Sequence, residues 1–386
     1  MENFIYSIPT DVYFGKNQIQ QIGKIILKYG KRVLLVYGGG SIKRNGAYYD
    51  VINELNKLDI YYTELSGVEP NPRITTVRKG IEICRKNNIE VILPIGGGSI
   101  IDCAKVIAAG VSYPNDPWDI VLDSTKIKNV LPIISVLTIA ATGSEMDSVA
   151  VISNMETNDK IGTGHKDMRP KASILDPTYT FSVPKIQTAA GTADIMSHII
   201  ETYFSNQTGY MQDRVAEGLL QTCIAFGIKA IEKPNNYEAR ANLMWASSWA
   251  INDFIKLGKN GKWSVHAIEH QLSAYYDITH GIGLAILTPH WMEYILNDQT
   301  VHKFSEFGIR VWNVEPTKDE YEIAREAIQK TKNYFVAMGI PQSLHEIGIK
   351  DDSYFDEMAE KASLKLTNAY VPLAKEDVKA IYYKSL

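Results

Sequence analysis

Two apolar runs, RVLLVY at 32–37 and EVILPI at 90–95, each lead directly into Gly-Gly-Gly-Ser. Unbroken apolar runs are typical of parallel strands that are buried on both faces. A helical stretch follows each glycine turn, and the alternation of strands with helices continues to about residue 185. This pattern predicts a Rossmann-like, doubly wound α/β domain over residues 1–185.

The character of the chain changes after residue 185, because helical stretches dominate from there to the end. We therefore expect an all-helical domain over residues 186–386. The opening segment FIYSIPTDVYFG at 4–15 is aromatic and β-branched but contains Pro9. It predicts an edge strand or a short hairpin, and pairing with a second subunit would protect such an edge. On this ground we expect a homodimer.

The glycine turns are candidate phosphate sites, because backbone N–H groups at the start of a helix can hold a pyrophosphate. The second glycine turn lies at 96–99. We expect Asp102 to lie in the first turn of the helix that follows, where it could cap the helix or contact a ribose or nicotinamide. A third loop, at 138–144, follows the apolar run LPIISVLTI. Tight connections also need glycine, and no GxGxxG is present, so turn chemistry and nucleotide binding both stay open.

Two helical stretches carry metal-binding residue types. In TAAGTADIMSHIIETYF (188–204), Asp194 and His198 are four residues apart and share a face. In SVHAIEHQLSAYYDITHG (264–281), His266 and His270 have the same spacing, and His280 precedes Gly281, where we expect the helix to break. These ligands suit Fe²⁺ or Zn²⁺. A surface ion pair is the alternative, but the apolar neighbours indicate burial, which favours a shared cation.

Composition excludes several classes of protein. The net charge of −4 argues against nucleic-acid or anionic-membrane partners. Three scattered cysteines without a CxxC indicate reduced core thiols. The N-terminus lacks a basic start and a continuous apolar stretch, and the longest apolar run is too short to span a bilayer as a helix. We expect a cytoplasmic protein whose partner is a small molecule.

The motifs, taken in order, resemble one family. They are FGKNQIQQIG, YGGGSIKRNGAYYDVI, GVEPNPR, LPIGGGSIIDCAKVIA, TIAATGSEMD, ILDPTYTFSVP, GTADIMSHIIETYF and HAIEHQLSAYYDITHGIGLAIL. Over nearly its whole length the chain resembles the metal-dependent alcohol dehydrogenases of the iron-containing type (group III), and within them NADPH-dependent butanol dehydrogenases and aldehyde reductases. The resemblance implies a dehydroquinate synthase-like architecture with an α/β and an all-helical domain.

The resemblance also implies roles for individual residues. A divalent Fe²⁺ or Zn²⁺ would be held by Asp194, His198, His266 and His280, with His270 near the nicotinamide. The residues expected to hold the cofactor are Gly38, Gly39, Gly40, Ser41, Asn71, Gly96, Gly97, Gly98, Ser99, Asp102, Thr138, Thr142, Ser144 and Lys160. Asp147 departs from the family, whose members often carry Asn there, and the connector at 253–263 is unfamiliar, which leaves the substrate range open.

NADP(H) is the expected cofactor. NAD-selective relatives carry an acidic residue at the end of the strand at 32–37, where it would repel a 2′-phosphate. This chain has uncharged residues at 38–41, followed by Lys43 and Arg44. The sequence thus predicts reversible, metal-assisted hydride transfer between NADP(H) and a primary alcohol or aldehyde such as butanol or butanal, with His270 as a proton relay or a packing partner of the nicotinamide.

Three alternatives remain at this stage. A glycerol dehydrogenase-like or dehydroquinate synthase-like enzyme would share the architecture, but phosphate- or carboxylate-bearing substrates would call for Arg or Lys among the apolar ligand segments. A metal-dependent hydrolase would have no use for two glycine turns. A non-catalytic nucleotide-binding scaffold would bind no metal.

Overall fold

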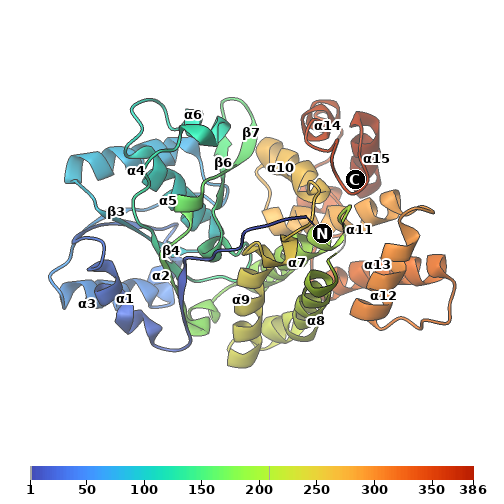
Figure 1. Cartoon of the computed structure of the whole chain (residues 1–386), viewed down its shortest axis with the longest axis horizontal. Helices are drawn as coiled ribbons and strands as arrows, with labels where there is room; N and C mark the ends of the chain where they lie inside the picture. The colour runs from blue at the N-terminus through green and yellow to red at the C-terminus, as the bar shows by residue number, and fades with distance from the viewer. Residues whose placement is uncertain (1, 208) are drawn as a thin grey trace. The chain divides into compact units, whose positions relative to one another are not determined.

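Six parallel strands form the main sheet, in the order β1-β8-β5-β4-β2-β3. The computed structural model describes residues 2–207 and 209–386 (Figure 1). The strands are β1 (Asp11–Phe14), β2 (Arg32–Val36), β3 (Tyr61–Leu65), β4 (Val91–Gly96), β5 (Ile134–Leu137) and β8 (Ala172–Leu175). Strands β6 (Val149–Asn154) and β7 (Asp159–Gly164) form a separate antiparallel hairpin. The predicted parallel sheet is confirmed.

Helices cover both faces of this sheet, as a doubly wound fold requires. The helices of this part are α1 (Ile22–Ile26), α2 (Ser41–Arg44), α3 (Ala47–Asn56), α4 (Ile74–Asn87), α5 (Gly98–Gly110) and α6 (Trp118–Leu122). Alternate residues of β2 separate the two cores: Leu34 packs with Val77 of α4 and Ile107 of α5, whereas Leu35 packs with Val51 of α3. The apolar runs are therefore buried on both sides.

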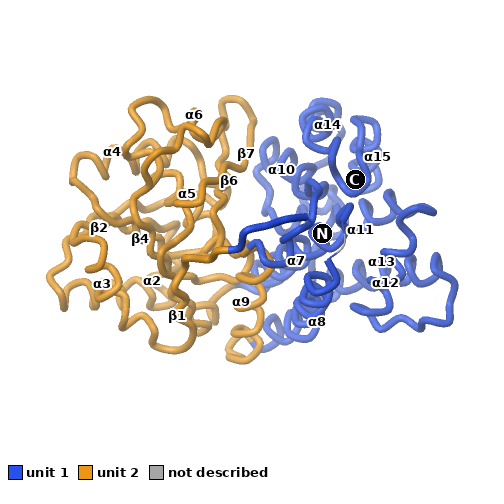
Figure 2. Tube along the Cα trace, viewed as in Figure 1, with its two compact units in different colours: residues 1–6, 184–233, 253–386 blue, residues 7–183, 234–252 orange. Residues whose placement is uncertain are grey.

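The chain divides into two compact units (Figure 2). One contains residues 7–183 and 234–252, and the other contains residues 2–6, 184–233 and 253–386. The division at 183/184 lies close to the predicted boundary at 185/186. Helix α9 (Tyr237–Ile251) groups with the sheet, because Met244 packs against Leu137 and Leu175 at the ends of β5 and β8. The domain assignment 1–185 and 186–386 itself stays a prediction.

Beyond residue 184, every named element in the described part of the chain is a helix. Besides α9 these are α7 (Lys185–Tyr203), α8 (Tyr210–Glu232), α10 (Ser264–Tyr276), α11 (His280–Ile295), α12 (Val301–Trp312), α13 (Glu320–Ala337), α14 (Phe355–Ser363) and α15 (Lys375–Ser385), with short 3-10 turns between some of them. No helix among the described residues is both long and apolar enough to cross a membrane.

One predicted boundary was wrong. We expected a helix to break at Gly281, but α11 begins at His280 and runs through that glycine. The break falls earlier, at Asp277, whose φ of 50° is left-handed. Gly281 serves close packing instead, because a Cβ built there would lie 2.1 Å from the backbone oxygen of Ala190 in α7. The glycine therefore lets α11 lie directly against α7.

Candidate active site

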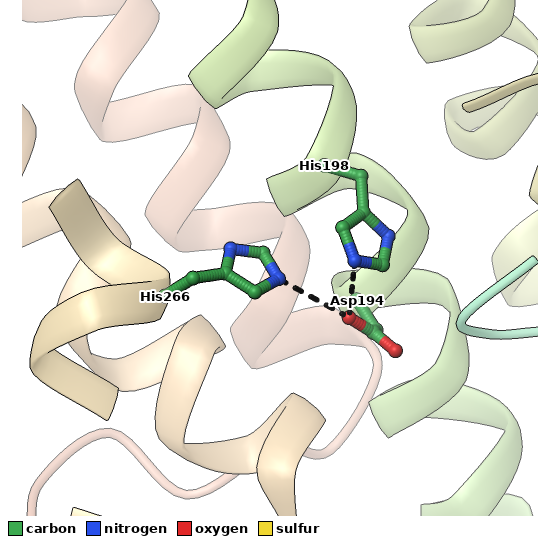
Figure 3. A group of neighbouring side chains, drawn as sticks. All are labelled: Asp194, His198 and His266. Carbon is green, nitrogen blue, oxygen red and sulfur yellow. Dashed lines mark ion pairs between the residues drawn. The ribbon is translucent and has the colours of Figure 1, made fainter. Parts of the chain in front are cut away.

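Asp194 and His198 lie on one face of α7, as their spacing predicted. The Asp194 Oδ1 atom lies 3.5 Å from His198 Nε2. The same oxygen lies 3.8 Å from His266 Nε2 of α10 and 3.8 Å from His280 Nε2 of α11. Figure 3 shows the rings of His198 and His266 pointing at this carboxylate. Three helices thus bring the four predicted ligands to one point within the helical unit.

The ligand atoms of Asp194, His198 and His266 all lie within 4.8 Å of one another, and His280 approaches this group at Asp194. Asp194 Oδ1 and His266 Nε2 are buried and have no hydrogen-bond partner among the described residues. Two donors about 2.1 Å from one ion in a tetrahedral site lie roughly 3.4 Å apart, close to the distances seen here. Buried polar atoms are costly unless they are paired, so a shared cation fits this donor set.

The pKa values of the site reflect burial and charge together. Burial raises the pKa of the Asp194 carboxyl, but the charges of the surrounding histidines outweigh it and lower that pKa to about 2. Burial lowers the pKa of His198 to about 4 against the opposing effect of Asp194. His266 is also buried, but Glu201 and Asp194 raise its pKa to about 9. The pKa values of these two buried imidazoles are thus shifted in opposite directions, down for His198 and up for His266.

Two glutamates that sequence reasoning missed contact these histidines on their other ring nitrogen. The Glu201 carboxylate bonds to His266 Nδ1, and the Glu269 carboxylate bonds to His280 Nδ1. Both glutamate side chains are buried. The sequence shows only that each acid lies three residues after a predicted ligand, near the same face of its helix, and not which histidine of another helix it contacts.

Trp263, the residue before α10, was missed as well. Its ring lies 5.2 Å from the His198 ring and 4.8 Å from the His266 ring, between ring centroids. The rings of His198 and His266 stack on each other at 4.6 Å. The connector at 253–263 therefore supplies an aromatic wall beside the predicted ligands.

His270 lies next to the cluster. Its ring centroid is 5.5 Å from that of His280 and 6.2 Å from that of His266. Glu269, His270 and His280 also offer ligand atoms that lie within 4.8 Å of one another. His270 is half-buried, in contrast to the buried His266. It is therefore placed beside the four convergent donors.

In the other unit, the three predicted loops follow three adjacent strands. The turn at 38–41 follows β2, the turn at 96–99 follows β4, and Thr138 follows β5. Because β4 lies between β2 and β5 in a parallel sheet, all three loops lie side by side at the carboxyl ends of these strands. The chain order reverses between β2 and β4, where open α/β sheets bind their ligands.

Close packing holds the second and third loops together. A Cβ at Gly98 would lie 2.1 Å from Thr142 Oγ1, so only glycine allows these loops to approach. Helix α5 begins at Gly98 without a side-chain cap and without an acidic residue in its first turn, so the expectation that Asp102 lies in that turn and caps the helix was wrong. The N–H groups of that turn are therefore compatible with a pyrophosphate.

A buried polar network occupies some of the predicted cofactor residues. Asp102 accepts hydrogen bonds from Ser144 Oγ (2.6 Å) and from the backbone N–H of Val151 (2.9 Å). The fully buried Lys105 donates to Ser144 Oγ (2.8 Å) and bonds to Asp147. Burial raises the pKa of the Asp147 carboxyl to about 7, while Lys105 opposes that shift. The hydrogen bond between Asp102 and Ser144 therefore joins α5 to the third loop.

Asn71, Ser99 and Lys160 also lie close to this region. Ser99 Oγ bonds to the backbone oxygen of Pro70, next to the buried Asn71. Lys160 pairs across the hairpin with Ser153, whose N–H donates to the oxygen of Pro72 (2.8 Å). The structure thus brings the turn at 70–72, the start of α5 and the hairpin together.

Comparisons with known proteins agree with this arrangement. The family model for iron-containing alcohol dehydrogenase matches residues 9–177, and the model for the C-terminal part of Fe-containing alcohol dehydrogenases matches residues 188–386. This chain belongs to the iron-containing alcohol dehydrogenase family. Membership makes it an oxidoreductase and implies a divalent metal and a nicotinamide cofactor.

Individual relatives of this alcohol dehydrogenase cover its whole length or nearly so. The chain is 62% identical to NADH-dependent butanol dehydrogenase A of Clostridium acetobutylicum over 100% of both chains. It is 38% identical to the NADPH-dependent aldehyde reductase YqhD of Escherichia coli, over 92% of this chain and 91% of that protein. The crystal structure of NADH-dependent butanol dehydrogenase A from Thermotoga maritima superposes with a TM-score of 0.95 at 39% identity, covering 100% of this chain and 99% of that one.

Proposed function

We propose that this protein is an NADPH-dependent alcohol dehydrogenase that interconverts aldehydes and primary alcohols such as butanal and butanol. The observation that carries the proposal is the convergence of three imidazole Nε2 atoms on Asp194 Oδ1, at 3.5 to 3.8 Å. The names of the butanol dehydrogenases and the aldehyde reductase support the substrate class. Family membership disfavours the hydrolase and scaffold alternatives.

In this proposal Asp194, His198, His266 and His280 hold Fe²⁺ or Zn²⁺. The bound ion would polarise the carbonyl oxygen, and the nicotinamide would supply or accept the hydride. Trp263 packs beside the rings of His198 and His266 and would limit the access of water on that side. His270, half-buried beside His280, is the group that hands a proton to the product oxygen or packs against the nicotinamide.

The cofactor would lie along the edge formed by the three loops. The start of α5 would hold the pyrophosphate, with Gly96 to Ser99 close to its oxygens and Thr138 and Thr142 beside it. Asn71 would lie by the adenosine. Burial raises the pKa of the Asp102 carboxyl, and the charges of Lys105 and, to a smaller extent, Lys160 oppose that shift. Lys160 would contact the nicotinamide side of the cofactor.

The preference for NADPH rests on the turn at 38–41, which carries no acidic side chain. Lys43 is exposed just beyond it, and its Nζ lies 4.7 Å from the centre of the Tyr48 ring. NADH is the alternative, and two observations favour it. Close relatives are named NADH-dependent. The carboxylate of Glu64 on β3 is nearby and accepts hydrogen bonds from Tyr37 (2.5 Å) and Tyr48 (2.7 Å).

Lys43→Ala should discriminate between the two cofactors. If Lys43 contacts a 2′-phosphate, its loss should raise KM for NADPH about tenfold, the effect of one charge-assisted contact worth roughly 1.4 kcal/mol. KM for NADH should stay within about twofold. Steady-state kinetics with both cofactors measure this, and Lys57→Ala, which removes a lysine paired with Glu54 on α3, is the matched control. Equal effects on both cofactors would contradict the assignment.

The proposed reaction is tested by following NADPH absorbance with butanal. The purified chain should lose activity when a chelator removes the metal and regain it on addition of Fe²⁺ or Zn²⁺. Parallel assays with NADH rank the two cofactors. Full activity in protein whose metal content has been shown to be zero would overturn the proposed function.

We also propose that the chain forms a homodimer in the cytoplasm. Strand β1 lies at the edge of the sheet and, among the strands of the described residues, pairs with β8 alone, so a strand of a second subunit would protect its other side. The three cysteines are buried and free, which suits a reducing compartment. Sedimentation velocity that found only monomers at micromolar concentration would contradict the dimer.

A further inference from the structure

Two of the three histidines around Asp194, His266 and His280, each form a hydrogen bond through Nδ1, the ring nitrogen that faces away from Asp194. In both cases the partner is a buried carboxylate from a different helix or helical turn. The contacts run in sequence through the unit: Glu201 of α7 holds His266 of α10, and Glu269 of α10 holds His280 of α11. The helices that supply the metal ligands are therefore also joined by carboxylate–imidazole contacts.

Glu201 fixes both the backbone and the ring of His266. Its carboxylate accepts hydrogen bonds from the backbone N–H groups of Val265 (2.6 Å) and His266 (3.2 Å) at the start of α10, in addition to the bond with His266 Nδ1. An anion at a helix N-terminus is stabilised by the unpaired N–H groups there. The position of α10 and the rotation of the His266 ring are thus set by one side chain.

Glu269 reaches His280 because a glycine of α11, Gly283, leaves room for its side chain. A Cβ at Gly283 would lie 2.8 Å from Glu269 Cγ, so glycine keeps this path open. The second oxygen of Glu269 accepts a hydrogen bond from Ser273 Oγ. The carboxylate is fully buried and has its partners on both sides.

His198 is held differently. Its Nδ1 atom is buried and has no hydrogen-bond partner among residues 2–207 and 209–386. Its ring instead packs against those of Trp263 and His266. The carboxylate contacts are therefore specific to two of the three histidines, rather than a general feature of the cluster.

We propose that Glu201 and Glu269 are positioning residues that prepare His266 and His280 for the metal. A carboxylate on Nδ1 keeps the proton on that nitrogen, so the lone pair of Nε2 faces Asp194 and the imidazole is a stronger donor. Two buried anions behind the ligands also favour a dication over a neutral site. This inference rests on the proposed function, because it assumes a metal at Asp194.

Equilibrium binding of Co²⁺ to the metal-free chain tests the inference, with the visible Co²⁺ spectrum as a second readout. Contacts of this kind are typically worth 10- to 100-fold in metal affinity, and we expect Glu269→Ala to weaken Co²⁺ binding by about that factor. Glu269→Gln keeps an acceptor for His280 Nδ1 and should recover part of the loss. Glu201→Gln should weaken Co²⁺ binding at least as much as Glu269→Ala does, because the amide N–H₂ of the glutamine would face the backbone N–H of Val265. Both glutamine variants should shift the Co²⁺ spectrum.

Glu217→Gln is the matched control. Glu217 is a buried glutamate of the same unit whose partners are Tyr203 and Arg214, and its replacement should leave Co²⁺ affinity and spectrum unchanged. Circular dichroism of the metal-free variants checks folding, and Glu269→Gln carries the test if Glu269→Ala does not fold. Wild-type affinity and spectrum in Glu269→Gln and Glu201→Gln would overturn the inference alone. Failure of the wild-type chain to bind Co²⁺ would overturn the proposed metal centre with it.

Discussion

Asp194→Asn should abolish metal binding and reduce butanal reduction by about 10³-fold or more, a loss of roughly 4 kcal/mol of transition-state stabilisation. Asp194 Oδ1 is the atom on which all three histidines converge, and it supplies the negative charge among the proposed ligands. Asparagine keeps the shape but removes that charge. The measurements are metal content of the purified variant and the rate of NADPH oxidation.

Two variants separate this effect from general damage to the site. Thr192→Val changes a buried residue of the same helix whose hydroxyl bonds only to the backbone of Thr188 among the described residues, so metal and activity should be retained. His270→Ala should keep the metal and lose activity, because His270 lies beside the proposed ligands rather than among them. An Asp194→Asn variant with full metal content would contradict the ligand assignment, and a metal-free His270→Ala would contradict the role of His270.

The sequence predicted this cluster because helical spacing and residue type are local properties. Asp194 and His198 share a face at four residues apart whatever else the chain does, and the apolar neighbours indicated burial. Glu201 and Glu269 were missed because their function depends on which helices pack together. The sequence does not show that α7 meets the start of α10, or that α10 meets α11.

The parallel sheet could also be predicted from the sequence, since buried strands such as β2 and β4 are continuous apolar runs. The placement of α9 with the sheet was not, because it depends on Met244 packing against strand ends far away in the sequence. Local propensity also misled at Gly281. Glycine commonly ends helices, but Gly281 lies inside α11, where it allows a close approach to the backbone of α7. Tertiary packing therefore outweighs local propensity at this position.

Gly281→Ala should therefore destabilise the protein and weaken metal binding together. The new Cβ would lie 2.1 Å from the oxygen and 2.7 Å from the carbonyl carbon of Ala190. These are backbone atoms of a buried helix, so α11 and α7 must separate. Overpacking of this kind costs roughly 3 kcal/mol. Gly281 adjoins His280, and Ala190 lies one turn before Asp194, so the separation should also spread the proposed ligands.

Thermal unfolding and Co²⁺ binding measure the two effects, and the chain offers a matched control. Gly218 is an exposed glycine inside α8 where an added Cβ meets nothing within 4 Å. Gly218→Ala should stabilise the protein by about 0.5 to 1 kcal/mol, because alanine loses less entropy than glycine in a helix. It should leave Co²⁺ affinity unchanged. If Gly281→Ala behaved like Gly218→Ala in both measurements, the close contact between α11 and α7 would not be what sets the ligand geometry.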